Sequence, residues 1–189
     1  MAVFNKGIIS GLAVFVAAFS VALISGCSTP GQTVRTTTHT LPTADTLAVD
    51  TAALLDDSSA VAAIRRLEAD PLDSGAADLR RHLFLWLVAS PKLQNFASDT
   101  PPVDELQKSD FPYREELLLQ YLFGSAAWVI SGAPGDLTDQ QEAGLRSLIA
   151  AYRSMVQREP AHRDAFIDML DGLRRKGELR GYIQRLRER

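Results

Sequence analysis

Apolar and polar positions alternate with the period of an α-helix over roughly the last two-thirds of the chain. From about residue 54 to residue 189, apolar side chains recur every three or four positions, and clusters of β-branched residues are scarce. This recurrence is typical of amphipathic helices, whereas the residues of a strand alternate every second position. We therefore predict one all-α domain over 54–189, an irregular helical bundle of about five to six helices.

Proline and capping residues divide the first part of this domain into two helices. The first is predicted over 58–69 and ends before Pro71, because the residue preceding a proline disfavours the helical conformation. The second is predicted over about 74–90. Its segment 83–88 (Leu-Phe-Leu-Trp-Leu-Val) is apolar on every side, which is typical of a central helix. We therefore expect the second helix to form the core of the bundle.

The rest of the domain follows a long connection, 90–110, that contains three prolines and favours a short helical turn at 103–108. Thr138 and Gln141 have the spacing of a capping box and predict the start of a further helix. Helix pairs that end in proline also occur in tetratricopeptide repeats, but no 34-residue period is present. The helices expected after the connection cover 113–131, 138–159, 161–176 and a short segment from 178, beyond Gly177.

The first thirty residues have a different pattern. Lys6 precedes an uncharged stretch of small and apolar residues, 7–24, and the only cysteine of the chain follows at Cys27. A short cationic start, an apolar stretch and small residues form the layout of an export signal. An uncharged stretch of this length could also span a bilayer as a transmembrane helix, in which case Cys27 would be incidental.

The run Ile24-Ser25-Gly26-Cys27 resembles the lipobox of bacterial lipoproteins, an aliphatic residue and two small residues before a cysteine. The resemblance implies a diacylglyceryl group on the Cys27 thiol, cleavage between Gly26 and Cys27, and frequent acylation of the new amine. It also implies a cell-membrane anchor that faces the periplasm. In such lipoproteins an aspartate after the cysteine favours retention in the inner membrane, so Ser28 favours the outer membrane.

These patterns divide the chain into three parts: a signal peptide (1–26), an acylated cysteine with a flexible linker (27–53) and the all-α domain (54–189). Threonine, proline, serine and glycine dominate the linker, and such a composition cannot bury enough apolar surface to offset the entropy of ordering. About 25 residues of flexible coil have a root-mean-square reach of roughly 25–30 Å. The linker would thus hold the domain just off the membrane.

Catalytic and metal-binding motifs are absent from the sequence. The three histidines, His39, His82 and His162, do not pair at helical spacing, and neither HExxH nor a cysteine cluster occurs. Glu115 and Glu116 are the best carboxylate pair, but adjacent helical residues point in different directions, and acids favour a helix start. The sequence therefore predicts no catalytic residue, no metal ligand and no cofactor.

Two other function classes remain open. An envelope enzyme acting on cell-wall material would need a polar cleft that joins Glu115, Glu116 or His82 to other titratable groups. A small-ligand carrier would use Trp86, Tyr121 and Trp128 as the walls of a pocket, although core packing also accounts for these aromatics. The geometry of these side chains discriminates between the classes.

Charge is unevenly distributed along the chain. Residues 172–189 contain seven basic and two acidic residues, a net charge of +5, whereas the whole chain carries −3. Cations at a helix end also suit the helix dipole. As a candidate interaction surface, this segment would meet an envelope protein, a cell-wall polymer or lipid headgroups; nucleic acid is not expected outside the cytoplasm. The residues of the candidate surface are Arg174, Arg175, Lys176, Arg180, Arg185 and Arg187.

Overall fold

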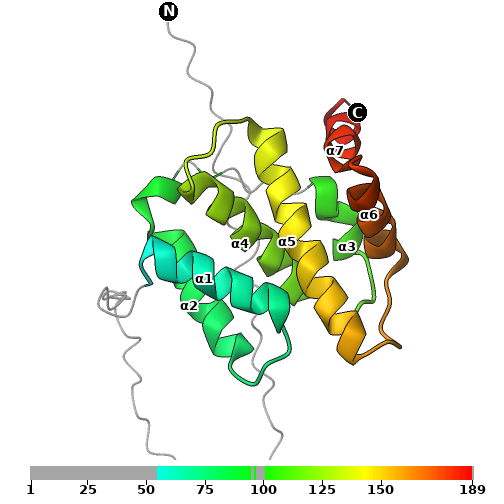
Figure 1. Cartoon of the computed structure of the whole chain (residues 1–189), viewed down its shortest axis with the longest axis horizontal. Coiled ribbons are helices and arrows are strands. Elements are labelled where there is room, and N and C mark those ends of the chain that lie inside the picture. The colour runs from blue at the N-terminus through cyan, green and yellow to red at the C-terminus, as the bar shows by residue number, and fades with distance from the viewer. Residues whose placement is uncertain (1–54, 95, 97–100, 189) are drawn as a thin grey trace, which may run out of the picture. The chain divides into compact units, whose positions relative to one another are not determined.

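The computed structural model describes residues 55–94, 96 and 101–188, which form seven α-helices and no β-strand (Figure 1). The predicted all-α bundle is confirmed. The predicted signal peptide, Cys27 and the linker lie outside the described residues. Within them, no helix is both long and apolar enough to cross a membrane. The helices are α1 (Asp57–Ala69), α2 (Ala76–Ala89), α3 (Asp104–Gln107), α4 (Arg114–Ile130), α5 (Leu137–Arg158), α6 (Ala165–Lys176) and α7 (Leu179–Arg187), with short 3₁₀ turns η3 (Pro91–Leu93) and η4 (Pro101–Val103).

The pair formed by α4 and α5 is the centre of the bundle (Figure 1). Small residues allow the two helices to approach closely, because Gly124 and Ser125 of α4 meet Gly144 and Ser147 of α5. A Cβ atom added at Gly144 would lie 2.7 Å from the backbone oxygen of Tyr121 and closer still to Ser125 Oγ. Such close packing leaves no room for a larger side chain at this crossing.

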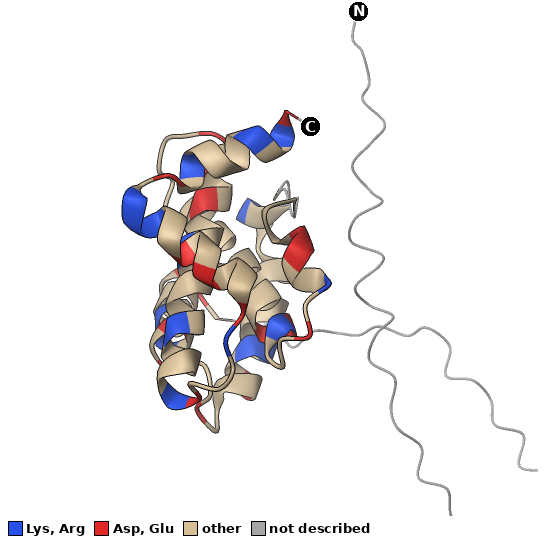
Figure 2. Cartoon of the chain, turned by 90° about the vertical axis from the view of Figure 1, so that its right-hand side faces the viewer, with Lys and Arg blue, Asp and Glu red and all other residues tan. Residues whose placement is uncertain are grey.

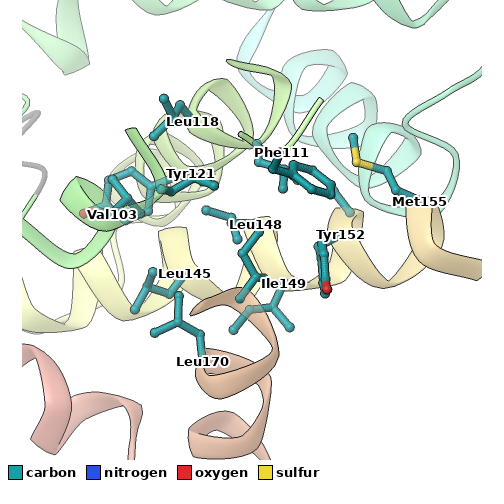
Figure 3. Packing of buried hydrophobic residues seen from close by; sticks show 14 of the residues in the cluster. Val103, Phe111, Leu118, Tyr121, Leu145, Leu148, Ile149, Tyr152, Met155 and Leu170 are labelled. Atoms are coloured by element: carbon teal, nitrogen blue, oxygen red, sulfur yellow. The ribbon is translucent and has the colours of Figure 1, made fainter. Parts of the chain in front are cut away.

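One side of this pair is covered by α3, α6 and α7, which bury the larger hydrophobic cluster with α4 and α5. Figure 3 shows the side chains of α5 pointing from one helix face toward both α4 and α6. Their spacing is the amphipathic stripe predicted for this helix. Fully or almost fully buried members of the cluster include Val103, Leu106, Leu117, Tyr121, Leu145, Leu148, Ile149, Tyr152, Met155, Ile167, Leu170, Leu179 and Ile183.

The other side of the pair is covered by α1, α2 and η3, which bury a smaller cluster around Ile64, Leu83, Trp86 and Phe123. The expectation that α2 forms the core is wrong. Only Ala76, Leu83 and Trp86 of α2 are buried, because the helix lies at the edge of the bundle and has protein neighbours on one face. A helix that is apolar on every side is fully buried only where other elements pack against all of its faces.

A buried polar network ties α1 to the central pair. The Gln120 amide donates to Ser147 Oγ (2.8 Å), which donates in turn to the Glu68 carboxylate (2.6 Å). Ser154 Oγ of α5 donates to the backbone oxygen of Glu68 (2.8 Å). Because buried polar groups need partners, these bonds fix the position of α1 along α5.

Two helix starts differ from the sequence-based expectation. The capping box of α5 is made by Asp136 and Asp139, and not by Thr138 and Gln141. Thr138 instead lies buried in the first turn, and aspartate two residues earlier is an equally favourable cap. The helix expected from 161 begins only after Asp164, whose carboxylate accepts from the Ile167 N–H (3.0 Å).

Candidate interaction surface

The predicted basic segment folds as the end of α6 and the whole of α7, joined at Gly177. This glycine has a left-handed φ of 72°, and its N–H donates to the Arg174 carbonyl while the Glu178 N–H donates to that of Leu173. Glycine adopts this conformation without strain, which ends α6 and turns the chain into α7. Figure 2 shows the basic positions gathered at the end of α6 and along α7.

Several of these cations are used inside the fold. The guanidinium of Arg180 forms ion pairs with Asp136 (3.3 Å) and Asp139, the two residues that cap α5. Arg187 donates to the buried Thr138 Oγ1 (3.2 Å) on the same turn. These contacts fasten α7 to the start of α5. The N–H of Asp139, followed by that of Thr138 and by Arg180, lowers the pKa of the Asp136 carboxyl group, which keeps it ionised.

Two further cations share one carboxylate on α6. Asp171 lies 2.8 Å from the Arg174 guanidinium and 3.8 Å from that of Arg175. Arg174 is half-buried, whereas the side chain of Arg175 is exposed. One carboxylate cannot neutralise two guanidinium groups, so Arg175 keeps part of its positive charge at the surface.

Lys176 and Arg185 are exposed and form no ion pair or hydrogen bond with any residue that the structure describes. Together with Arg175 they make up what we call the C-terminal basic surface. Met169 lies on the same face of α6 as Lys176, and its side chain is 41% exposed. The surface therefore combines charge with an apolar side chain, a composition found at protein interfaces.

A second polar cluster, which was not predicted from the sequence, occurs at the connection between α5 and α6. Tyr113 OH donates to Glu159 Oε2 (2.7 Å), and His162 Nδ1 lies 2.7 Å from the same oxygen. These two hydrogen bonds, that of Tyr113 first, lower the pKa of the Glu159 carboxyl group. Tyr113 and Glu159 are 46 positions apart in the sequence, so only the folded chain brings them together.

This cluster borders a shallow groove of about 340 Å³ that also contains Ser109 and Asp164. Ser109 Oγ donates to Asp164 Oδ2 (2.5 Å), and Tyr152 OH accepts from the Asp164 N–H (2.9 Å). A catalytic serine is activated by a base that is free to take its proton. The Asp164 carboxylate, which accepts from the Ser109 hydroxyl, is instead engaged as the N-cap of α6. These bonds hold the α5–α6 connection, and we assign the cluster a structural role.

The residues considered for an enzyme site do not line a common cleft. Glu115 is exposed, and Glu116 and His82 are half-buried; none of them borders the α5–α6 groove or the shallow groove of about 390 Å³ between α1 and α5. No three His, Cys, Asp or Glu side chains within the described ranges converge as metal ligands.

The aromatic residues considered for a ligand pocket are also separated. Tyr121 belongs to the larger hydrophobic cluster and Trp86 to the smaller one, both buried, while Trp128 is half-buried farther along α4. Tyr121 and Trp86 are therefore packing residues of separate clusters, and none of the three aromatics borders either groove.

No family model, no curated protein and no solved structure matches the chain.

Proposed function

We propose that the chain is a membrane-anchored lipoprotein of the bacterial envelope whose helical domain binds an envelope partner and has no enzymatic activity. The anchor follows from the lipobox-like run that ends at Cys27. The partner would be an envelope protein with an acidic surface, and a cell-wall polymer is the alternative that the test below can reveal. No cofactor, metal or nucleic acid takes part in this proposal.

The observation that carries the proposal is the C-terminal basic surface. Arg180 and Arg187 are accounted for by their contacts with α5, but Lys176 and Arg185 contribute no such contact to the described part of the fold. Cations that the described part of the fold does not use, with the exposed Met169 on the same face of α6 as Lys176, suit a complementary acidic surface. Such complementarity accelerates association and weakens with salt.

Lipidation would add to this binding without adding a contact. Two or more acyl chains on Cys27 would hold the protein stably at the membrane, whereas one chain anchors only marginally. A tethered domain meets other envelope components at a high effective concentration. An outer-membrane location, favoured by Ser28, would place the domain toward the cell wall.

The proposal is tested by cross-linking in cells, followed by affinity purification and mass spectrometry. The test variant is Lys176→Glu with Arg185→Glu, which lowers the net charge by four units and removes no ion pair between described residues. Its control is Arg153→Glu with Lys108→Glu, which changes the net charge by the same amount at exposed positions outside α6 and α7. Lys108 gives up only an exposed ion pair with Glu105, which contributes little to stability. Cys27→Ala removes the proposed site of lipidation.

A reproducible acidic partner, lost in the Lys176 and Arg185 variant but kept in the control, is the expected result. Capture should also fall in the Cys27→Ala strain and in buffers of higher ionic strength. Equal capture by the test and control variants would refute the assignment of the surface. Capture of cell-wall fragments in place of a protein would identify a polymer as the partner class.

A further inference from the structure

The outward face of α6 is uncharged over most of its length. Ala165, Met169, Gly172 and Lys176 follow one another at intervals of four, three and four positions, so they form one stripe along the helix. Met169 is 41% exposed, and Ala165 and Lys176 are exposed as well. The buried residues of α6 lie on the other side, toward the core. Surface helices usually carry charged and polar residues on the face that this stripe occupies.

Gly172 leaves open space in the middle of the stripe. A Cβ atom added there would meet nothing within 4 Å, and the backbone of Gly172 is not left-handed. Neither packing within the described chain nor the backbone conformation therefore requires glycine, which is an unfavourable residue inside a helix. The α6 helix lies at the edge of the bundle (Figure 1). A second helix could approach its backbone closely at this point, because interaxial distance depends on the side chains at the contact.

The cations at the end of the stripe indicate the charge of the occupant. Lys176 forms no ion pair or hydrogen bond with a described residue. Arg175 lies 3.8 Å from the Asp171 carboxylate, which is already 2.8 Å from Arg174. A second copy of the chain that offered the same stripe would bring no carboxylate on it to these cations. Lipid headgroups could pair with them, but a lipid surface makes no use of the open space beside Gly172. The occupant favoured by both features is an acidic helix of another protein.

We propose that the partner of the C-terminal basic surface presents an acidic amphipathic helix that packs along this stripe of α6. An apolar side chain of the partner lies over Gly172 beside Met169, and its carboxylates face Arg175 and Lys176. The stripe is about 16 Å long at 1.5 Å per residue, enough for about three turns of a partner helix. Helices recognised in this way offer anchors at intervals of three and four residues. The inference rests on the proposed function and names the kind of partner that the surface takes.

The test begins with photo-cross-linking of the full-length chain in the bacterium that produces it. The photoreactive residue p-benzoylphenylalanine replaces Met169 in one strain and Phe84 in the control strain, because the two side chains are exposed to 41% and 42%. The expected product, formed from position 169 and not from 84, is a bond to a partner segment with Asp or Glu at helical spacing beside an apolar residue. A synthetic peptide with the sequence of that segment then serves as the probe for binding to the purified full-length chain.

The open space at Gly172 is tested by size. Gly172→Gln should weaken binding of the peptide about tenfold, because an overpacked contact costs enough for such a change. Ala77→Gln, at an exposed position of α2, is the control and should leave the affinity unchanged. Gly172→Ala should bind the peptide more weakly than the native chain although its urea midpoint rises. A merely structural effect would move affinity and stability in the same direction.

Several outcomes would overturn the inference. These are the absence of a cross-link at position 169, a cross-link to lipid, to a cell-wall polymer or to a second copy of the chain, and one to a protein segment without acids at helical spacing. Equal affinities of Gly172→Gln and Ala77→Gln would do the same. The two proposals fail separately: if Lys176→Glu with Arg185→Glu loses the partner while Gly172→Gln keeps it, only the helix contact is wrong. If the former variant also keeps the partner, the proposed function is wrong.

Discussion

The close crossing of α4 and α5 is tested by replacing Gly144 with alanine. The new methyl group would lie 2.7 Å from the Tyr121 backbone oxygen and 2.7 Å from its Cδ2 atom, and closer to Ser125 Oγ. A serine hydroxyl can rotate away, but a backbone oxygen moves only if α4 moves. Relief of this overlap therefore requires the two central helices to separate.

The magnitude follows from two opposed effects. Overpacking of a filled core costs about 1–3 kcal/mol, and a contact with the backbone favours the upper half of that range. Replacing glycine by alanine within a helix stabilises the helix by about 1 kcal/mol. We therefore expect Gly144→Ala to lower the free energy of unfolding by about 1–2 kcal/mol. Gly172, on α6, is the matched control because an added Cβ there meets nothing within 4 Å. Gly172→Ala should raise the stability by about 0.5–1 kcal/mol.

Urea unfolding followed by circular dichroism measures both changes. With a slope of about 2 kcal/mol/M, the two variants should differ by about 1 M in midpoint. An equal rise in stability for Gly144→Ala and Gly172→Ala would show that the central helices are not in close contact and would refute the packing described for α4 and α5.

The remaining predictions concern α7 and pH. The backbone N–H groups of α7 should exchange with deuterium several-fold faster in the variant Arg180→Gln than in the control Arg185→Gln, because only Arg180 is paired with Asp136 and Asp139. Equal exchange rates in the two variants would contradict the attachment of α7 to α5. The pKa of Asp57 is lowered by hydrogen bonds from Lys92 and Trp86, and that of Asp168 by one from Arg163 and a second from Tyr152. The stability that these carboxylates confer is fully present above their unfolded pKa of about 3.9 and is lost as pH falls through their lower folded values. As the pH is lowered below about 4, the urea midpoint should therefore decrease, and it should decrease less steeply in the double variant Asp57→Asn with Asp168→Asn. If the midpoint of the double variant decreased as steeply as that of the native chain, these pairs would not stabilise the fold.

The presence of most helices could be predicted from the sequence, because it depends on the spacing of apolar residues over a few positions. The stripe along α5 and the break at Gly177 are encoded within a few residues and appear in the structure where they were expected. The helix starts at Asp136 and Asp164 were missed. Several capping residues stand close together at these points, and the choice among them depends on tertiary contacts such as that of Asp164 with Tyr152.

Positions in the bundle could not be predicted in the same way. The composition of α2 indicated a central helix, but Phe84 and Val88 are exposed, because no element of the described chain covers their face. The basic segment was recognised as a whole. Some of its cations, such as Arg180, fasten α7, and others, such as Lys176, have no ion pair with a described residue. This division depends on carboxylates about forty positions away.

The most direct test of the proposed function is the intact mass of the protein extracted from the membranes of the bacterium that produces it. The expected result is a chain that begins at Cys27 and carries a diacylglyceryl group, with an additional acyl chain where the amine is modified. Cys27→Ala should abolish both the mass increase and the processing. A native chain that keeps residues 1–26, or one that begins at Cys27 without lipid, would contradict the lipid anchor.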